Sequence, residues 1–170
     1  MPERLGGPRD PDRKVVSLSG AAAAARAARR AGRKVVLANG VFDLLHAGHA
    51  RLLAAARRLG DLLIVAVNTD ASVRRLKGPG RPVVGHRDRA LLLASLEAVD
   101  RVVLFGEDTP IRVIRAVLPD VLVKGADWKS GAIVGQDVVE SRGGRVVRVP
   151  IVKGKSTTSI VRGILHRPRR

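Results

Sequence analysis

The side chains best suited to chemistry gather in one run, residues 39–49, which reads Asn-Gly-Val-Phe-Asp-Leu-Leu-His-Ala-Gly-His. It follows a short apolar segment and precedes apolar residues at helical spacing. His46 and His49 are three residues apart, so both imidazoles would lie on one face at the start of a helix. Gly48 leaves space between them for a bulky anion, and Gly40 lets a ligand approach the backbone closely.

This spacing indicates phosphate chemistry. A helix N-terminus offers free N–H groups and the positive end of the helix dipole, and imidazole N–H groups there can stabilise charge that grows on phosphate oxygens. Two other interpretations are a purely structural role and metal binding with Asp43. A closed zinc site needs a fourth ligand, and the only other histidines are His86 and His166, so no protein-bound metal is expected.

The elements that must hold these residues alternate between short apolar strands and helices. The expected strands are residues 34–38, 62–67, 101–105, 121–124 and 145–149. The expected helices are one from a Ser17 or Ser19 cap to Ala31, three over residues 48–59, 70–76 and 87–98, one starting at Thr109 and one over residues 157–165. This pattern predicts an α/β fold: a Rossmann-like, doubly wound, parallel five-stranded sheet with helices on both faces. Ligands bind such sheets at the carboxyl ends of the strands, where the polar motifs lie.

Length and composition fit one globular domain. The chain has 170 residues, of which 45% are hydrophobic and none is cysteine, so disulfides are excluded and a reducing compartment fits. No apolar run is long enough to span a bilayer and the N-terminus has no signal-peptide pattern, so we expect a cytoplasmic protein with no membrane partner. The catalytic domain is expected over residues 15–165, between a flexible leader at 1–14 and a basic tail at 166–170.

The formal charge of +17 fits either nucleic acid or phosphorylated small molecules as partners. Compositional bias toward arginine is a third explanation, because the basic residues are spread along the whole chain. Aromatic residues make up only 2%, so platforms for base stacking are scarce. We therefore expect no nucleic-acid partner, and a non-catalytic basic nucleic-acid-binding domain is the alternative from another class.

The run G-V-F-D-L-L-H-A-G-H, residues 40–49, resembles the signature of the HxGH nucleotidyltransferase superfamily, which is cytidylyltransferase-like. Within it, the chain is most similar to the D-glycero-β-D-manno-heptose 1-phosphate adenylyltransferases, over residues 15–165. The further motifs that carry the resemblance are V-N-T-D-A-S-V-R-R-L-K-G (67–78), R-A-L-L-L-A-S-L-E-A-V-D (89–100), E-D-T-P (107–110), L-V-K-G-A-D-W (122–128) and K-S-T-T-S-I (155–160).

The resemblance implies an enzyme that transfers AMP from ATP to this heptose 1-phosphate, giving ADP-heptose and pyrophosphate. It implies that His46, His49 and Lys77 are catalytic: the histidines contact the triphosphate and Lys77 binds phosphate. The nucleotide-binding residues that it implies are Asn39, Gly40, Val41, Phe42, Asp43, Gly48, Arg89, Lys124, Gly125, Asp127, Ser156, Thr157 and Thr158.

The same resemblance implies Mg²⁺ with ATP as the cofactor, and a homodimer is compatible with it. The chain is too short to include the sugar kinase domain of the bifunctional heptose enzymes, so a separate kinase is expected to supply the substrate. Two positions depart from the family pattern. Val41 stands where the heptose enzymes usually have cysteine, and Ile151 stands where glycerol-3-phosphate cytidylyltransferases have arginine. The second departure argues against CTP, and a cytidylyltransferase acting on glycerol 3-phosphate or another small phosphorylated acceptor is the alternative enzyme.

Overall fold

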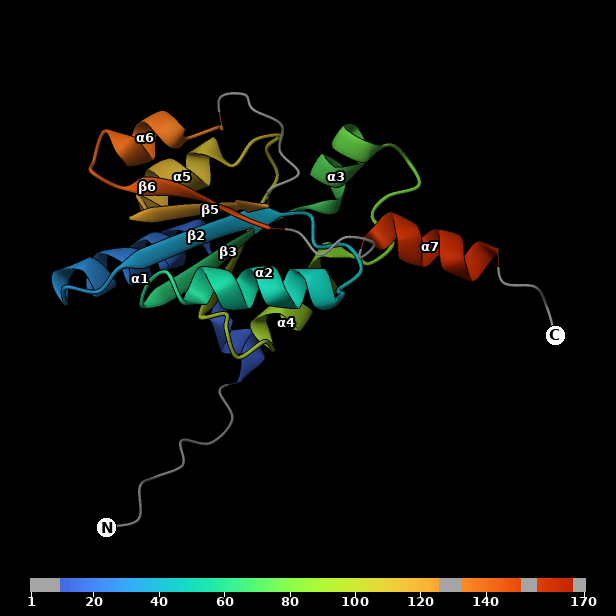
Figure 1. The fold of residues 1–170 in the computed structure, drawn as a ribbon, viewed down its shortest axis with the longest axis horizontal. Helices are drawn as coiled ribbons and strands as arrows, with labels where there is room; N and C mark the ends of the chain where they lie inside the picture. The colour runs from blue at the N-terminus through green and yellow to red at the C-terminus, as the bar shows by residue number, and fades with distance from the viewer. Residues whose placement is uncertain (1–9, 126–132, 151–155, 167–170) are drawn as a thin grey trace, which may run out of the picture.

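The computed structural model describes residues 10–125, 133–150 and 156–166, and these ranges form a parallel α/β sheet covered by helices on both faces (Figure 1). The strands are β1 (Val15–Val16), β2 (Val35–Gly40), β3 (Leu62–Asn68), β4 (Arg101–Phe105), β5 (Val121–Gly125) and β6 (Arg145–Val149). They lie in the order β1-β4-β3-β2-β5-β6, and every pair is parallel.

The prediction of five strands is wrong, because the sheet has six. The additional strand is β1, which pairs with β4 through Val15 opposite Val102 and Val16 opposite Val103. Only two residues long, it lacks the run of four to eight residues by which a strand is recognised in a sequence. The remaining strands lie at the expected places, within one or two residues at their ends.

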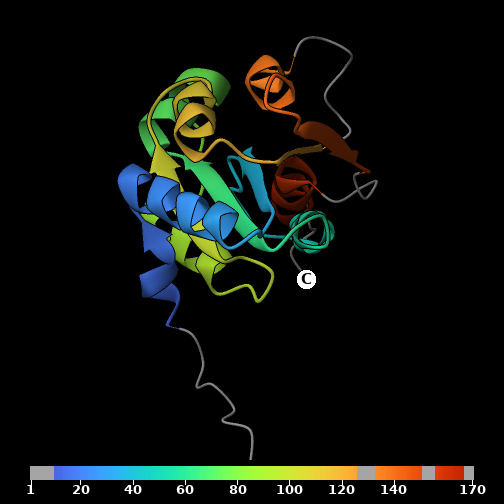
Figure 2. The same cartoon turned by 90° about the vertical axis from the view of Figure 1, so that its left-hand side faces the viewer.

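Helices pack on the sheet in two layers, as Figure 2 shows. One layer contains α1 (Leu18–Arg30), α5 (Ile111–Val117) and α6 (Gln136–Glu140), and the other contains α2 (Ala47–Arg57) and α4 (His86–Ala94). Along β2, Val35 and Leu37 face the first layer, whereas Val36 and Ala38 face the second. Both sets are fully buried, as expected for a parallel sheet covered on both sides.

The chain crosses the middle of the sheet once, and this crossing creates the place for a site. After β2 it forms β3 and β4 on one side, then returns past β2 to form β5 and β6 on the other. β2 and β5 are therefore neighbours with connections that leave in opposite directions. Such a topological switch point leaves a crevice at the carboxyl ends of the two strands.

Two further helices lie beyond the carboxyl ends of the strands (Figure 1). They are α3 (Asp70–Lys77) and α7 (Thr157–Leu165). α7 begins at Ser156, whose hydroxyl accepts a hydrogen bond from Ser159 N while the Ser159 side chain accepts one from Ser156 N. Its far end exposes 66% of Ile164 and 73% of Leu165, so α7 is anchored mainly at its first turn.

A short helix precedes the expected start of the domain at residue 15. Residues Pro11–Lys14, which belong to the expected leader, form a short 3₁₀ helix, and Lys14 Nζ donates to Leu96 O at 3.3 Å. Residues 1–9 and 167–170 lie outside the described ranges. Across the described ranges, no helix combines the length and apolar character needed to cross a membrane.

Candidate active site

A cavity of about 700 Å³ opens at the switch point, between the carboxyl ends of β2 and β5 and the first turns of α2 and α7. The structure brings most of the predicted site residues to its wall: Asn39, Gly40, Val41, Phe42, Asp43, His46, Gly48, His49, Lys77, Lys124, Gly125, Ser156, Thr157 and Thr158. Arg89 is not part of this wall, and Asp127 lies outside the described residues, as does Ile151. That these residues bind a nucleotide remains a prediction.

The two histidines form a stacked pair at the start of α2. His46 is the N-cap residue, and its Nδ1 accepts a hydrogen bond from Gly48 N at 3.1 Å. The His46 and His49 ring centroids are 3.8 Å apart with an interplanar angle of 22°. Because Nδ1 of His46 is an acceptor, the proton of its neutral form lies on Nε2.

Phe42 holds the other side of this pair. Its ring meets His49 edge-on, with centroids 5.1 Å apart. Its backbone has φ +49°, a left-handed conformation that costs free energy in a residue with a side chain and recurs at functional sites. A Cβ on Gly40 would come within 3.2 Å of the Phe42 ring, so glycine at position 40 lets the ring lie against β2.

His49 is neutral at pH 7. Burial lowers its pKa from 6.5 to about 4, the positive charges of His46 and Lys77 act in the same direction, and a hydrogen bond with the Leu44 backbone acts against them. A neutral imidazole can donate one hydrogen bond without bringing a full positive charge. His49 therefore brings an imidazole without a full positive charge to the cavity wall.

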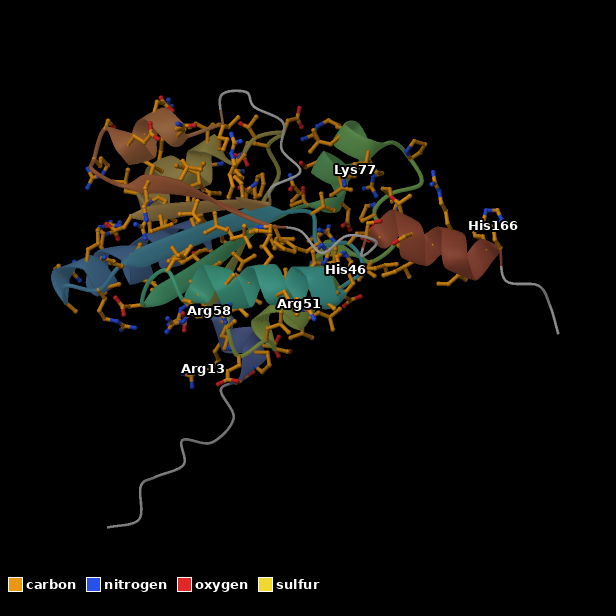
Figure 3. The ribbon with its side chains drawn as sticks, in the orientation of Figure 1. Arg13, His46, Arg51, Arg58, Lys77 and His166 are labelled. Atoms are coloured by element: carbon orange, nitrogen blue, oxygen red, sulfur yellow. The ribbon has the colours of Figure 1, made fainter. Side chains whose placement is uncertain are left out.

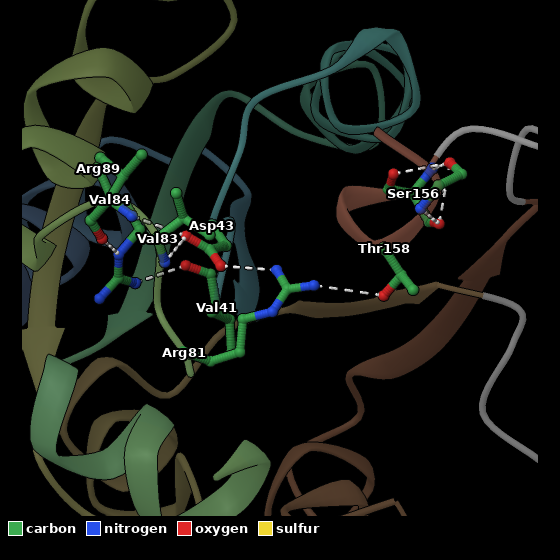
Figure 4. A network of polar contacts seen from close by, with 9 residues as sticks. Val41, Asp43, Arg81, Val83, Val84, Arg89, Ser156 and Thr158 are labelled. Carbon is green, nitrogen blue, oxygen red and sulfur yellow. Dashed lines mark hydrogen bonds and ion pairs between the residues drawn. The ribbon is translucent and has the colours of Figure 1, made fainter. Parts of the chain in front are cut away.

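Asp43 organises the loop between α3 and α4. Its Oδ1 accepts hydrogen bonds from Val83 N at 2.8 Å and Val84 N at 3.0 Å, and its Oδ2 accepts one from Arg81 Nη1 at 2.9 Å (Figure 4). Burial acts to raise the pKa of this carboxyl, but the hydrogen bonds from Val84, Arg81 and Val83 outweigh it and leave the pKa below its ordinary value. Asp43 is therefore a charged structural centre of the cavity wall.

Arg89 supports the same loops from behind. Its side chain is fully buried, and its guanidinium donates to Val84 O at 2.8 Å, Val41 O at 2.6 Å and Asp70 Oδ1 at 2.7 Å. Two of these acceptors are backbone carbonyls of loops that form the cavity wall or adjoin it. Arg89 thus holds these loops in place from outside the cavity wall, and its predicted contact with the nucleotide stays a prediction.

Lys124 joins the two central strands at the bottom of the cavity. Its Nζ donates to Asn39 Oδ1, which links the end of β5 to the end of β2. Only 5% of Lys124 is exposed, and burial lowers its pKa to about 8. Its ammonium group is still mostly protonated at pH 7, which favours an anionic ligand beside β5.

Other parts of the cavity wall are also basic. Lys77, at the end of α3, lies with His46 near the first turn of α7, where Ser156, Thr157 and Thr158 contribute to the wall (Figure 3). The first turn of a helix has N–H groups without intrahelical partners, so α2 and α7 both present an anion-binding end. Two helix N-termini and a lysine around one cavity suit a ligand with several phosphate groups.

Sequence reasoning missed several residues of the wall. Asn68, Arg81, Asp108, Thr109 and Pro110 also line the cavity. Asn68 ends β3 and could have been found, since polar residues at the carboxyl ends of strands were the expected signal. Arg81 lies in a loop broken by Gly and Pro, and only the folded chain shows that this loop turns back toward Asp43.

Known proteins resemble this chain over most of its length. The model of the cytidylyltransferase-like family matches residues 37–162. A bifunctional protein HldE of Trichlorobacter lovleyi is 53% identical over 159 residues, which are 94% of this chain and 32% of that protein. One of Gluconobacter oxydans is 58% identical over 139 residues, which are 82% of this chain and 29% of that protein. The chain thus spans about a third of the length of these curated relatives.

A solved structure agrees with this assignment. The crystal structure of a lipopolysaccharide core biosynthesis protein from Thermoplasma volcanium is 34% identical, with a TM-score of 0.60, and covers 73% of this chain and 100% of its own. The family match includes the HxGH run, the switch point and α7, so the resemblance inferred from the motifs is confirmed. The chain belongs to the cytidylyltransferase-like family of nucleotidyltransferases.

Proposed function

We propose that the chain transfers AMP from ATP to a sugar 1-phosphate, D-glycero-β-D-manno-heptose 1-phosphate, and releases pyrophosphate and ADP-heptose. The observation that carries this proposal is the stacked His46–His49 pair, which shares one cavity with Lys124 and the first turn of α7. Similarity to proteins named HldE, at 53% and 58% identity, supports the heptose acceptor, as do the motifs at residues 67–78 and 89–100.

The proposed reaction needs no nucleophilic side chain. An oxygen of the sugar phosphate attacks the α-phosphorus of ATP, a new P–O bond forms, and the bond from that phosphorus to the bridging oxygen of pyrophosphate breaks. The protein holds the two phosphates in line and stabilises charge on the oxygens around phosphorus. His46 and His49 would donate hydrogen bonds to these oxygens, while Lys77 and the first turn of α7 would bind the leaving phosphates.

A divalent metal accompanies the nucleotide in this family, and we propose Mg²⁺. In the described ranges, no group of three or more His, Asp or Glu side chains lies close enough together to hold a metal. Asp43, which lines the cavity, already accepts three hydrogen bonds. These residues fit an ion that the phosphates of the nucleotide hold, as is usual for Mg²⁺, and its charge would offset that of the pyrophosphate.

The acceptor must be phosphorylated before it reaches this cavity. We propose a sugar kinase as its source, since the reaction uses a phosphate oxygen of the sugar as the attacking group. The relatives named bifunctional are about three times as long as this chain, which leaves room in them for a second activity. A kinase that phosphorylates the anomeric position is the class of enzyme required.

Pyrophosphate release tests the proposal. ATP, CTP, GTP and UTP are each incubated with Mg²⁺ and a panel of acceptors that includes heptose 1-phosphate, glucose 1-phosphate and glycerol 3-phosphate. We expect release with ATP and heptose 1-phosphate, and none from the His46→Ala protein. A preference of tenfold or more for CTP in direct competition would overturn the adenylyl assignment, and turnover with glycerol 3-phosphate alone would overturn the sugar acceptor.

A further inference from the structure

Arg81 is a cationic residue of the cavity wall whose role the HxGH motif does not explain. It lies four residues after Lys77, beyond a Gly-Pro-Gly turn, so the two cations enter one cavity from the two ends of a short loop. Its side chain is 20% exposed, and its Nη1 lies 2.9 Å from Asp43 Oδ2. The guanidinium is thus held in place at the cavity wall.

Asp43 fixes this guanidinium together with the backbone beside it. The same carboxylate accepts the N–H groups of Val83 and Val84, so it holds the segment that follows Arg81 at two further points. These hydrogen bonds lower the pKa of Asp43 against the effect of burial, which keeps the carboxylate charged at neutral pH. A charged partner on one edge of a guanidinium orients the other edge before any ligand arrives.

The other edge of Arg81 points toward α7 (Figure 4). Its Nη2 lies 3.5 Å from Thr158 Oγ1, a long contact that a stronger acceptor could replace. The two hydrogen bonds that the structure shows, to Asp43 and Thr158, leave the other N–H groups of the guanidinium for a ligand. A planar fork of N–H groups matches two phosphate oxygens at once, which the ammonium group of Lys77 cannot do.

The geometry points to Arg81 as a binding residue for the phosphates that leave as pyrophosphate. This inference rests on the proposed function and adds a residue to it. Lys77, Arg81 and Thr158 belong to the side of the cavity formed by α3, its following loop and α7, whereas Lys124 lies beside β5. Arg81 binds two oxygens of the terminal phosphates with its free edge, while Asp43 holds the edge behind it.

The test is binding of inorganic pyrophosphate in the presence of Mg²⁺, measured by calorimetry on the full chain. Arg81→Gln keeps a donor for Asp43 and removes the charge, and Arg81→Lys keeps the charge and removes the fork. The matched control is Arg112→Gln, because Arg112 also pairs with a carboxylate, Glu107, but lies outside the cavity. ATP, AMP and heptose 1-phosphate are measured with the same proteins.

We expect Arg81→Gln to lower the affinity for pyrophosphate and for ATP by about tenfold or more, while the affinities for AMP and heptose 1-phosphate stay within about twofold of wild type. The pyrophosphate affinity of Arg81→Lys should lie between those of wild type and Arg81→Gln, and the affinity of Arg112→Gln should equal that of wild type. Unchanged pyrophosphate affinity in Arg81→Gln overturns the inference. An equal loss of affinity for AMP together with a lower melting temperature also overturns it, because it assigns Arg81 a structural role. A loss of affinity confined to heptose 1-phosphate overturns it too, because it assigns Arg81 to the acceptor. Wild type that binds neither pyrophosphate nor ATP overturns the proposed function as well.

Discussion

At the scale of single residues, the histidine pair shows how one short motif fixes the orientation of two imidazole rings. Gly48 N occupies Nδ1 of His46, and the rings of His46 and Phe42 hold His49 from two sides. The lowered pKa of His49 means that stacking the two rings does not stack two full charges. In the proposed reaction, a neutral His49 would bind the ground-state phosphates weakly and gain as charge develops, which is the behaviour of a transition-state contact.

Removal of either imidazole should therefore reduce kcat more than it raises KM. His46→Ala and His49→Ala should each lose about 10²–10³ in kcat, the usual effect of one such donor. His46→Asn and His49→Asn should keep part of the activity, because they still donate a hydrogen bond. Steady-state kinetics with thermal melting measure both effects, and His166→Ala, at the exposed end of α7, is the control. A lower melting temperature with wild-type kcat would assign a structural role instead.

Lys124 should give the enzyme a basic limb in its pH profile. Its pKa falls from 10.5 in the unfolded chain to about 8 in the folded one, so the ammonium charge disappears as pH rises through 8. If that charge binds phosphate, KM for a substrate should rise above pH 8, and in Lys124→Arg the limb should move to higher pH. The effect on stability has the opposite sign. Because the unfolded chain binds more protons than the folded chain between pH 8 and 10.5, the contribution of Lys124 to the free energy of unfolding increases as pH rises through that range. If the basic limb stays at the same pH in Lys124→Arg, the titration of another group causes it.

At the scale of elements, the cavity depends on a helix that does not line it. α4 carries Arg89, and the buried guanidinium ties the loop after β2 to the loop before α4 through Val41 and Val84. Asp70, at the start of α3, accepts a third hydrogen bond from the same guanidinium. Two loops that are distant in sequence thus share one buried cation, so the geometry of the site depends on the packing of α4.

Loss of this cation should act on stability. Arg89→Met removes the guanidinium from two carbonyls and from Asp70, which keeps His86 as a partner, and breaking a buried pair of this kind costs about 3–5 kcal/mol. We expect a melting temperature lower by at least several degrees, with ATP affinity changed less, in denaturation and binding measurements below the transition. Arg87→Met, on the exposed face of the same helix, is the matched control. A tenfold loss of ATP affinity at unchanged melting temperature would instead indicate that Arg89 binds the nucleotide.

The behaviour of Arg89 also marks what the sequence can predict. Hydrophobic runs located five of the six strands, and the HxGH run located the start of α2, because both signals are local. β1 was missed because a two-residue strand exists only through its pairing with β4. Arg89 begins a motif and Arg81 lies in a Gly/Pro-broken loop, but their partners, Val41 and Asp43, lie 48 and 38 residues away. Which of the two reaches a ligand is decided by tertiary packing.

At the scale of the whole molecule, the charge of +17 is spread over several elements. Arg13, Arg51 and Arg58 lie on the helices below the sheet in Figure 3, apart from Lys77 and His46 at the cavity. A field of this kind raises the local concentration of anionic substrates and makes their capture depend on salt. With few aromatic residues, it gives little basis for reading a nucleic-acid sequence.

Duplex DNA should accordingly bind weakly and without sequence preference. We expect a Kd of about 10⁻⁴–10⁻⁶ M near physiological salt, the range of non-specific binding, with a steep loss as salt increases. Fluorescence anisotropy with two unrelated duplexes over a series of salt concentrations provides the measurement. Sub-micromolar affinity that differs between the duplexes at physiological salt would contradict this and favour the nucleic-acid-binding alternative.

The place of β5 beside β2 also determines how the chain can fold during synthesis. Asn39 and Lys124, which meet in the finished site, are 85 residues apart, so at about 5–20 residues per second a ribosome needs roughly 4–17 s to deliver the second after the first. Throughout that interval one edge of a valine-rich strand has no neighbour, and such edges are templates for aggregation. We expect the net positive charge of the chain to keep nascent copies apart by repulsion, so the arginines proposed to attract phosphorylated substrates would also protect the unfinished sheet.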